Sequence, residues 1–304
     1  MNYKISFLFL LVALMSCKKD STTSKTYSKH QYLISAKELK EIGKEEGIKI
    51  IDFRKESAYK KEHIANAIHL WRDDIVNKNY GYDGMMPIPN EIEKLFSELG
   101  IKSTDHLVIY DDIGLCEAAR LWWILQNYSF TNVKLLQGGL QSWKQISGET
   151  NSTIPSFTKT NFKLPKEKSM KYYIAKDDVK QQLSTSILID TRTKDEYLGK
   201  YQKKGAAKAG RIANSLHLDW AETIHYHGDQ SLKSIEELEK IYSNLNIEKN
   251  DSIILYCHSG VRSAHTTFVL TQLLGYKNVK NYDGSWIEWS RFNELPYENE
   301  STIK

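Results

Sequence analysis

The chain has 304 residues, which is long for one domain and comfortable for two. Hydrophobic residues make up 40% of it and aromatic residues 11%, enough for ordinary packed cores. The formal charge of +4 comes from 42 basic and 38 acidic residues without a dense basic block, which argues against a nucleic-acid partner.

The N-terminus has the pattern of an export signal. One lysine precedes the apolar run 5–15, which is too short to span a bilayer as a stable helix and is typical of a signal peptide. The following letters, LMSC, resemble the bacterial lipobox, which implies removal of the signal and a lipid on Cys17. The alternative is an ordinary signal peptide with an incidental cysteine. We predict a signal and lipidation segment at 1–17, a flexible tether at 18–30, and a protein held in the cell envelope, at the outer membrane and facing the periplasm.

The rest of the chain contains one large internal repeat. IIDFRKESAYKKEHIANAIHL (50–70) is echoed by LIDTRTKDEYLGK (188–200) and GRIANSLHL (210–218). HLVIYDDIG (106–114) is echoed by SIILYCHSG (252–260), and NVKLLQGGLQSWKQ (132–145) by NVKNYDGSWIEWSR (278–291). Such a long period indicates a duplicated domain. We place the copies at 31–149 and 170–300, with an aperiodic linker at 150–169.

Each copy predicts an α/β fold. Short apolar runs at 48–53, 106–111, 187–190 and 252–257 are typical of buried strands. The segments 90–100, 118–130, 234–246 and 263–276 have helical spacing. Alternating strands and helices predict, in each domain, a mostly parallel sheet covered by helices on both faces.

The segment LYCHSGVRSAHT (255–266) carries the clearest chemistry. In open α/β sheets, ligands bind beyond the carboxyl ends of the strands, and Cys257 follows an apolar strand at that edge. Residues 258–263 should curl into the start of the next helix, where successive backbone amides bind anions. Such a ring of amides favours a thiolate, which is a nucleophile, and Arg262 adds a positive charge suited to an anionic donor. Gly260 permits the tight turn.

Together, DFR…HIANAIHL, YDDIG…AARLWW, LLQGGLQSW, CHSGVRS and YDGSWIEW resemble the tandem-domain rhodaneses, sulfurtransferases of the thiosulfate or 3-mercaptopyruvate type, over about residues 32–289. The resemblance implies two rhodanese-like domains, the second catalytic and the first inactive. It implies transfer of sulfane sulfur from a small anionic donor, through a persulfide on Cys257, to cyanide or a thiol, with no cofactor. The loop residues expected to bind the donor are His258, Gly260, Val261, Arg262 and Ser263.

The mercaptopyruvate branch of this family further implies a Ser/His/Asp relay across the two domains. The matching positions are Ser259, His63 and Asp52, and a hydroxyl oriented by a base could move the proton that a thiol donor requires. The alternative is that Asp52 and His63 only hold the first domain's own loops, since the same aspartate recurs as Asp190. The sequence leaves both interpretations of Asp52 and His63 open.

Two departures from the family pattern leave the donor open. Glu196 stands where the family has a donor-binding arginine, and the basic residue two positions after the cysteine is missing. An insertion supplies Lys203, Lys204 and Lys208, which could substitute or could form a solvated charge run.

Other residues of the sequence allow further interpretations. In the first copy Asp111 stands where the second has Cys257, and a carboxylate cannot accept sulfane sulfur. Cys116 is expected to pack in the core, and a disulfide between Cys116 and Cys257 is disfavoured because they lie in separate domains. His225 and His227 have a metal-like spacing, but nothing completes a zinc site. A non-catalytic sulfur-carrying or redox-sensing module is one alternative function. A cysteine phosphatase is another, although only four residues separate Cys257 from Arg262, where phosphatase loops have five.

Overall fold

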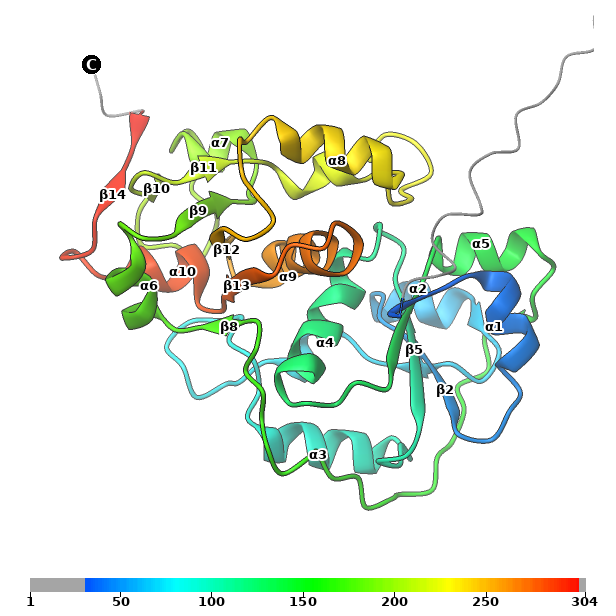
Figure 1. Cartoon of the computed structure of the whole chain (residues 1–304). Helices are drawn as coiled ribbons and strands as arrows, with labels where there is room; N and C mark the ends of the chain where they lie inside the picture. Colours follow the sequence, from blue (N-terminus) through cyan, green and yellow to red (C-terminus); the bar gives the residue numbers. More distant parts are fainter. Residues whose placement is uncertain (1–30, 301–304) are drawn as a thin grey trace, which may run out of the picture.

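The computed structural model describes residues 31–300, which form two domains of the same architecture (Figure 1). Each is built on a five-stranded sheet in which all paired strands are parallel. This confirms the predicted fold class. The first sheet has the order β1-β6-β5-β2-β4 and the second the equivalent order β8-β13-β12-β9-β11. The first consists of β1 (Leu33–Ile34), β2 (Ile48–Asp52), β4 (Ile68–His69), β5 (His106–Tyr110) and β6 (Val133–Leu136), and the second of β8 (Tyr173–Ile174), β9 (Ile187–Asp190), β11 (Leu216–His217), β12 (Ser252–Tyr256) and β13 (Asn278–Tyr282).

The helices also follow the repeat. Five α-helices belong to each domain, and short 3₁₀ turns follow β4 and β11 at equivalent places. The helix after β12 ends in a π-helical turn before Gly275, which has a positive φ. The helices are α1 (Ala36–Ile42), α2 (Glu56–Lys61), α3 (Pro89–Glu98), α4 (Cys116–Asn127), α5 (Gly139–Gln145), α6 (Lys176–Gln182), α7 (Lys194–Tyr197), α8 (Ile235–Ser243), α9 (Val261–Phe268) and α10 (Ser285–Trp289), with the turns η1 (Arg72–Ile75), η2 (Trp220–Thr223) and η3 (Val269–Leu273).

A short antiparallel pair closes the edge of each domain. In the first domain β3 (His63–Ile64) pairs with β7 (Thr150–Asn151), and in the second β10 (Arg211–Ile212) pairs with β14 (Tyr297–Glu298). Because β7 lies inside the segment 150–169, the expected linker begins as a strand of the first domain. The segment continues along that domain, where the ring of Phe162 packs against those of Phe96 and Phe130. It connects the domains while packing against the first.

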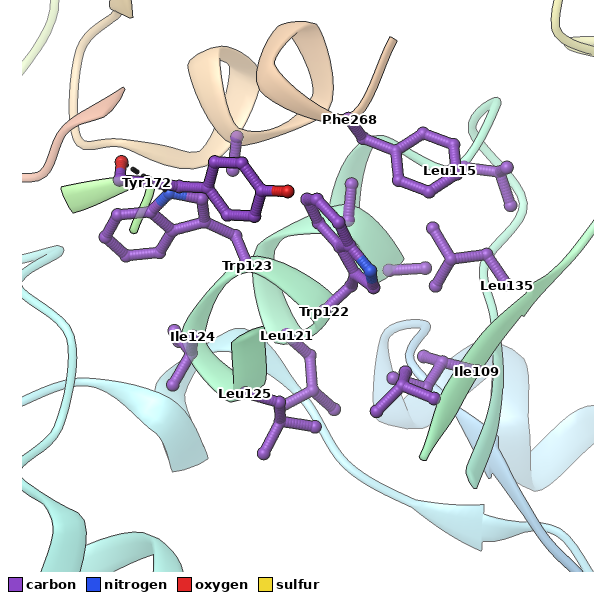
Figure 2. Close-up of a cluster of buried hydrophobic side chains, with 14 of the residues drawn as sticks. Ile109, Leu115, Leu121, Trp122, Trp123, Ile124, Leu125, Leu135, Tyr172 and Phe268 are labelled. Atoms are coloured by element: carbon purple, nitrogen blue, oxygen red, sulfur yellow. Dashed lines mark hydrogen bonds between the residues drawn. The ribbon is translucent and has the colours of Figure 1, made fainter. Parts of the chain in front are cut away.

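The two domains share one hydrophobic core. The main apolar cluster draws residues from both sheets and from α4 and α9, whereas a separate smaller cluster covers the outer face of each sheet. Nearly all of α4 is buried, because it lies between its own sheet and α9. Figure 2 shows Trp122 of α4 facing Phe268 of α9, with ring centroids 5.0 Å apart in a T-shaped arrangement.

Candidate active site

The loop after β12 lies at the carboxyl edge of the second sheet, as predicted. Cys257 follows the strand directly, and α9 begins at Val261. Gly260, the residue before the helix, has φ +76°, and a Cβ there would come within 2.8 Å of both the Arg120 guanidinium and the Asp283 carbonyl. The tight turn therefore requires glycine both for its backbone conformation and for space.

Hydrogen bonds from α10 hold the outside of this loop. The hydroxyl of Ser285 accepts the backbone N–H groups of Cys257 and Gly260, each at 3.1 Å, and donates to the carbonyl of Tyr282. The amides of Trp286 and Ile287 donate to the carbonyls of Cys257 and His258, at 3.0 and 2.9 Å.

The outward carbonyls decide where the next amides point. Because a trans peptide directs its C=O and N–H to opposite sides, the amides of His258 and Ser259 face the inside of the loop. The start of α9 adds further free amides. The chain therefore builds the predicted ring of donors.

The sulfur of Cys257 lies inside this ring, and the residue is 1% exposed. Burial by itself would raise the pKa of the thiol. The charge of Arg262, the hydroxyl and amide of Ser263 and the amide of Ser259 overcome that effect and hold the pKa of Cys257 below its usual range. The hydroxyl of Ser263 is fully buried and has no other partner among residues 31–300. This environment stabilises negatively charged sulfur.

Arg262 is not a freely available cation. Its guanidinium donates to both oxygens of Glu196, at 2.6 and 2.9 Å. Glu196 also caps α7 through Thr193. Although burial opposes ionisation, the bonds and charge of Arg262 lower the pKa of Glu196 to about 2. Glu196 is thus the counter-ion of Arg262. At the position of the family's arginine, this chain therefore carries the partner of its loop arginine.

Other cations complete the electrostatics around the sulfur. Partial burial and the neighbouring charge of Arg262 lower the pKa of Lys203, whereas Glu196 and Cys257 act in the opposite direction, so Lys203 lies within electrostatic reach of both the sulfur and the ion pair. Lys208 is engaged elsewhere, over the ring of Tyr297 at 4.2 Å. Of these two lysines, the structure therefore favours Lys203.

The first domain contributes Arg72, on η1. Its guanidinium binds both oxygens of Glu117. Burial would lower the pKa of Arg72, but the charge of Glu117 raises it, and the thiolate forms of Cys116 and Cys257 act in the same direction as Glu117. A cation from each domain therefore influences the sulfur. Arg72 could not be predicted as a site residue from the sequence, because nothing in its local pattern indicates contact with the other half of the chain.

His258 is a neutral side chain that lines the loop. Burial and the charge of Lys203 lower its pKa to about 4. Its Nε2 lies 3.1 Å from the carbonyl of Lys204, so this nitrogen carries the proton, and within the described part of the chain Nδ1 has no partner. The unprotonated Nδ1 of His258 can accept a hydrogen bond, but the neutral ring adds no positive charge for a donor at neutral pH.

The structure keeps Asp52 and His63 inside the first domain. Asp52 accepts two hydrogen bonds from the Arg54 side chain and one, at 2.5 Å, from the hydroxyl of Tyr110. The ring nitrogens of His63 face the carbonyls of Tyr59 and Thr153, at 2.7 and 3.1 Å.

The second domain repeats this arrangement. Arg192 binds Asp190 in the same way, beside Tyr256. Of the two interpretations, these contacts favour the structural one, in which Asp52 and His63 hold the first domain's loops; within residues 31–300 neither side chain is hydrogen-bonded to Ser259. Ser259 instead meets the loop at Gly84, where a Cβ would lie 2.5 Å from its own Cβ.

The equivalent loop of the first domain is filled by its own carboxylate. Asp111 accepts the amides of Ile113 and Leu115 on one oxygen, at 3.1 and 2.9 Å, and those of Glu117 and Ala118 on the other, at 2.8 and 2.9 Å. The amide ring thus persists in both copies. In the first copy a side-chain anion occupies it, which agrees with the prediction that this domain lacks a sulfur site.

The remaining candidates take structural places or lie outside the described residues. Cys116 and Cys257 are both free and buried, and burial raises the pKa of Cys116 well above its usual value. Within residues 31–300 no cluster of three metal-ligating side chains occurs, His225 and His227 included. The same residues contain no helix with the length and apolar character needed to cross a bilayer. Cys17 lies outside the described residues.

Comparison with known proteins agrees with this geometry. The rhodanese-like domain model matches the chain twice, at residues 35–146 and 175–292. The sulfur carrier protein TtuD of Thermus thermophilus is 34% identical over 68% of this chain and 75% of its own. A Mycobacterium tuberculosis protein provisionally named thiosulfate sulfurtransferase SseA is 32% identical over 91% of this chain and 93% of its own. The structure of SseA from Escherichia coli, a 3-mercaptopyruvate sulfotransferase by its description, superposes with a TM-score of 0.74 at 25% identity, covering 84% of this chain and 98% of its own.

Proposed function

The chain belongs to the rhodanese family and is a sulfurtransferase of the thiosulfate/3-mercaptopyruvate type, and we propose that Cys257 is the residue that carries the sulfur as a persulfide. The observation that carries this assignment is the lowered pKa of a buried cysteine ringed by backbone amides. The other free cysteine of the described residues has a raised pKa, and the aligned position of the first domain is a carboxylate.

The reaction follows from the site. The Cys257 thiolate attacks the outer sulfur of thiosulfate, the S–S bond of the donor breaks, and sulfite leaves with the bonding electron pair. The terminal sulfur of the persulfide carries the negative charge, which the inward amides stabilise. Cyanide or a thiolate then attacks that sulfur, giving thiocyanate or a new persulfide and restoring the Cys257 thiolate.

We propose thiosulfate rather than mercaptopyruvate as the donor. Cleaving the C–S bond of mercaptopyruvate requires a proton for the departing carbon, whereas sulfite leaves thiosulfate without one. Because His63 and Asp52 are bound within the first domain, the expected proton relay does not support the mercaptopyruvate reaction. We expect a higher kcat/KM with thiosulfate plus cyanide than with mercaptopyruvate plus cyanide. The opposite order would contradict this choice of donor.

The decisive test of the function compares wild type with Cys257→Ser. After incubation with thiosulfate, intact-mass measurement should show one added sulfur in the wild type and none in the variant, and thiocyanate should form only with the wild type. Cys116→Ser is the matched control and should keep both signals. A wild type that gains sulfur but never releases it to cyanide or thiols would support the sulfur-carrier alternative, and hydrolysis of phosphate esters would support the phosphatase.

Lys203 is the cation we propose for the donor. It lies near the sulfur, and Glu196 already neutralises Arg262. Replacing Lys203 by alanine should raise KM for thiosulfate about tenfold, because a partly screened ion pair with a doubly charged anion is lost. Lys208→Ala removes an equal charge from the same insertion and should leave KM unchanged. Equal effects from both variants would show that only the general field of the insertion matters.

We also propose that the protein is lipid-anchored through Cys17 in the cell envelope, facing the periplasm. The support is the apolar run 5–15 and the LMSC sequence. Cells expressing the wild type should incorporate labelled palmitate into the protein and retain it in the membrane fraction, and Cys17→Ala should abolish both. Labelling of the variant would contradict the anchor.

A further inference from the structure

One arginine of the first domain reaches the active-site loop of the second. Arg120 lies on α4 and is 2% exposed. Its Nη1 donates to the carbonyl of Gly260 at 3.3 Å, and its Nη2 donates to the carbonyl of Gly84 at 2.7 Å and to Asp283 at 2.6 Å. Its guanidinium also lies 4.7 Å from the ring of Trp123. The orientation of this side chain is therefore fixed from both domains.

Asp283 completes the bridge. It is 1% exposed, and its second oxygen accepts the backbone amide of Met86, which belongs to the first domain, at 2.9 Å. A fully buried ion pair is expensive to desolvate, and an apolar pair of similar size often gives equal or greater stability. Stability alone is thus a poor explanation for this pair, whereas its hydrogen bond to the active-site loop suggests a role in geometry.

The carbonyl held by Arg120 determines the direction of an amide in the ring. The peptide joining Gly260 to Val261 is trans, so a carbonyl directed toward Arg120 turns the N–H of Val261 the other way, into the loop that contains the sulfur. Asn281 and the amide of Ala264 donate to the same carbonyl, at 3.0 and 3.3 Å. Only glycine at position 260 lets the guanidinium approach so closely.

We propose that Arg120 is a positioning residue through which the first domain orients the Val261 amide toward the anionic sulfur of Cys257. The domain that has no nucleophile of its own thereby sets the reactivity of the other domain. Arg120 acts through geometry, because its charge is balanced by Asp283. The inference rests on Cys257 being the sulfur carrier.

The test follows ionisation of Cys257 directly. Ultraviolet absorbance of the thiolate is measured against pH, subtracting the same protein carrying Cys257→Ser. Arg120→Lys keeps the charge but lacks the planar fork that serves three acceptors. We expect its thiolate midpoint to rise by about one pH unit, and kcat/KM for thiosulfate to fall about tenfold, mostly in kcat, because a ring amide stabilises the charged sulfur.

Arg54→Lys is the matched control. Arg54 is also buried, also binds an aspartate with two hydrogen bonds, and also donates to a carbonyl, that of Glu62, but all these partners lie in the first domain. This variant should lose comparable stability in thermal unfolding and keep the wild-type midpoint. A purely structural effect would move both variants alike, and that result would overturn the proposal.

A second variant guards against misfolding. The double variant Arg120→Gln/Asp283→Asn removes both charges together and leaves no buried unpaired ion. It should show the raised midpoint as well. An unchanged midpoint in either variant, with native circular dichroism, would overturn the inference. Failure of the functional assignment looks different: the wild type itself would take up no sulfur from thiosulfate.

Discussion

At the residue scale, the site works by balancing opposed effects on one sulfur atom. Burial of Cys257 favours the neutral thiol, and Arg262, Ser263 and Ser259 favour the thiolate. Glu196 weakens the effect of Arg262 on the pKa of Cys257, because its negative charge partly neutralises the guanidinium. Since the carboxylate lies in a capping box at the start of α7 and has a pKa of about 2, it remains ionised at every pH at which the enzyme is expected to work.

Replacing Glu196 by glutamine should therefore make the site more electropositive. Glutamine preserves the capping box, so α7 should persist. Arg262 then acts on Cys257 without compensation, and we expect the thiolate midpoint to fall further and KM for thiosulfate to fall about threefold. On a pH–rate profile, the acid limb, where activity is lost as the thiolate takes up a proton, should shift to lower pH.

Asp195→Asn removes a carboxylate from the neighbouring exposed position and is the control, expected to change neither quantity. A Glu196→Gln enzyme with a raised KM would show instead that the pair is needed to hold Arg262 in place.

The sequence predicts the nucleophile and its turn, but not the residues that hold them from outside. Cys257 and Gly260 stand within one short motif. Ser285 is far along the chain, and it has φ +49°, a conformation that disfavours its side chain; the aligned position of the first domain is Gly139, with φ +50°. Only a comparison of the two copies, with glycine at position 139 and serine at position 285, could have indicated a special role for Ser285. Arg120 gave no local signal, because its partners are reached only after the two domains pack.

At the scale of elements, the α4–α9 contact contains a buried histidine. Nε2 of His265, on α9, lies 3.0 Å from the carbonyl of Gly114, just before α4. Nδ1 has no partner within the described residues. Burial lowers the pKa of His265 to about 4 from a usual value of 6.5. Between pH 6.5 and about 4, the ring of His265 is therefore neutral in the folded protein but protonated in the unfolded chain.

This histidine predicts an acid-sensitive domain contact. Because the pKa of His265 is lower in the folded protein, its neutral ring costs no stability above pH 6.5. As the pH falls from 6.5 toward 4, protonation of the unfolded chain lowers the free energy of unfolding by about 3 kcal/mol in total. His265→Gln can keep a donor to Gly114 but does not titrate. Urea unfolding measured from pH 7 to 4 should show a shallower loss of stability for this variant than for the wild type. Parallel curves would mean that other groups dominate the acid response.

The elements themselves were largely predictable. The buried strands of both sheets appear as short apolar runs, and α8 begins at Ile235 after the N-cap Ser234, within the segment whose pattern predicts a helix. The strand β7 was missed, because two polar residues in an aperiodic segment carry no strand signal and become a strand only by pairing with β3. The π-turn at the end of α9 was missed for a similar reason: its sequence fits a continuing helix.

At the scale of the whole molecule, the duplication predicts two domains but not the merging of their interiors. Trp122 and Phe268 come from different repeats and meet face to edge in one cluster (Figure 2). We therefore expect a single cooperative thermal transition for wild-type protein, with equal calorimetric and van't Hoff enthalpies.

Trp122→Ala should lower the free energy of unfolding by about 3–5 kcal/mol and separate the transition into two, since the cavity lies where the domains join. Trp143→Ala, in the outer cluster of the first domain, is the control and should destabilise without separating the transitions. Two resolved transitions in the wild type would contradict the shared core.

The carboxylate of Asp111 has a consequence for how the two halves differ. It accepts four backbone N–H hydrogen bonds, so the amide ring of the first loop is filled by a carboxylate of the same chain. That loop therefore needs no anion from solution to satisfy its amides. The substitution Asp111→Cys would place a thiol inside the amide ring of the first domain. The loop would still lack the positive charge of Arg262, because Cys116 occupies that position. Because both positions differ from the second domain, a sulfurtransferase site in the first domain would need changes at Asp111 and at Cys116 together.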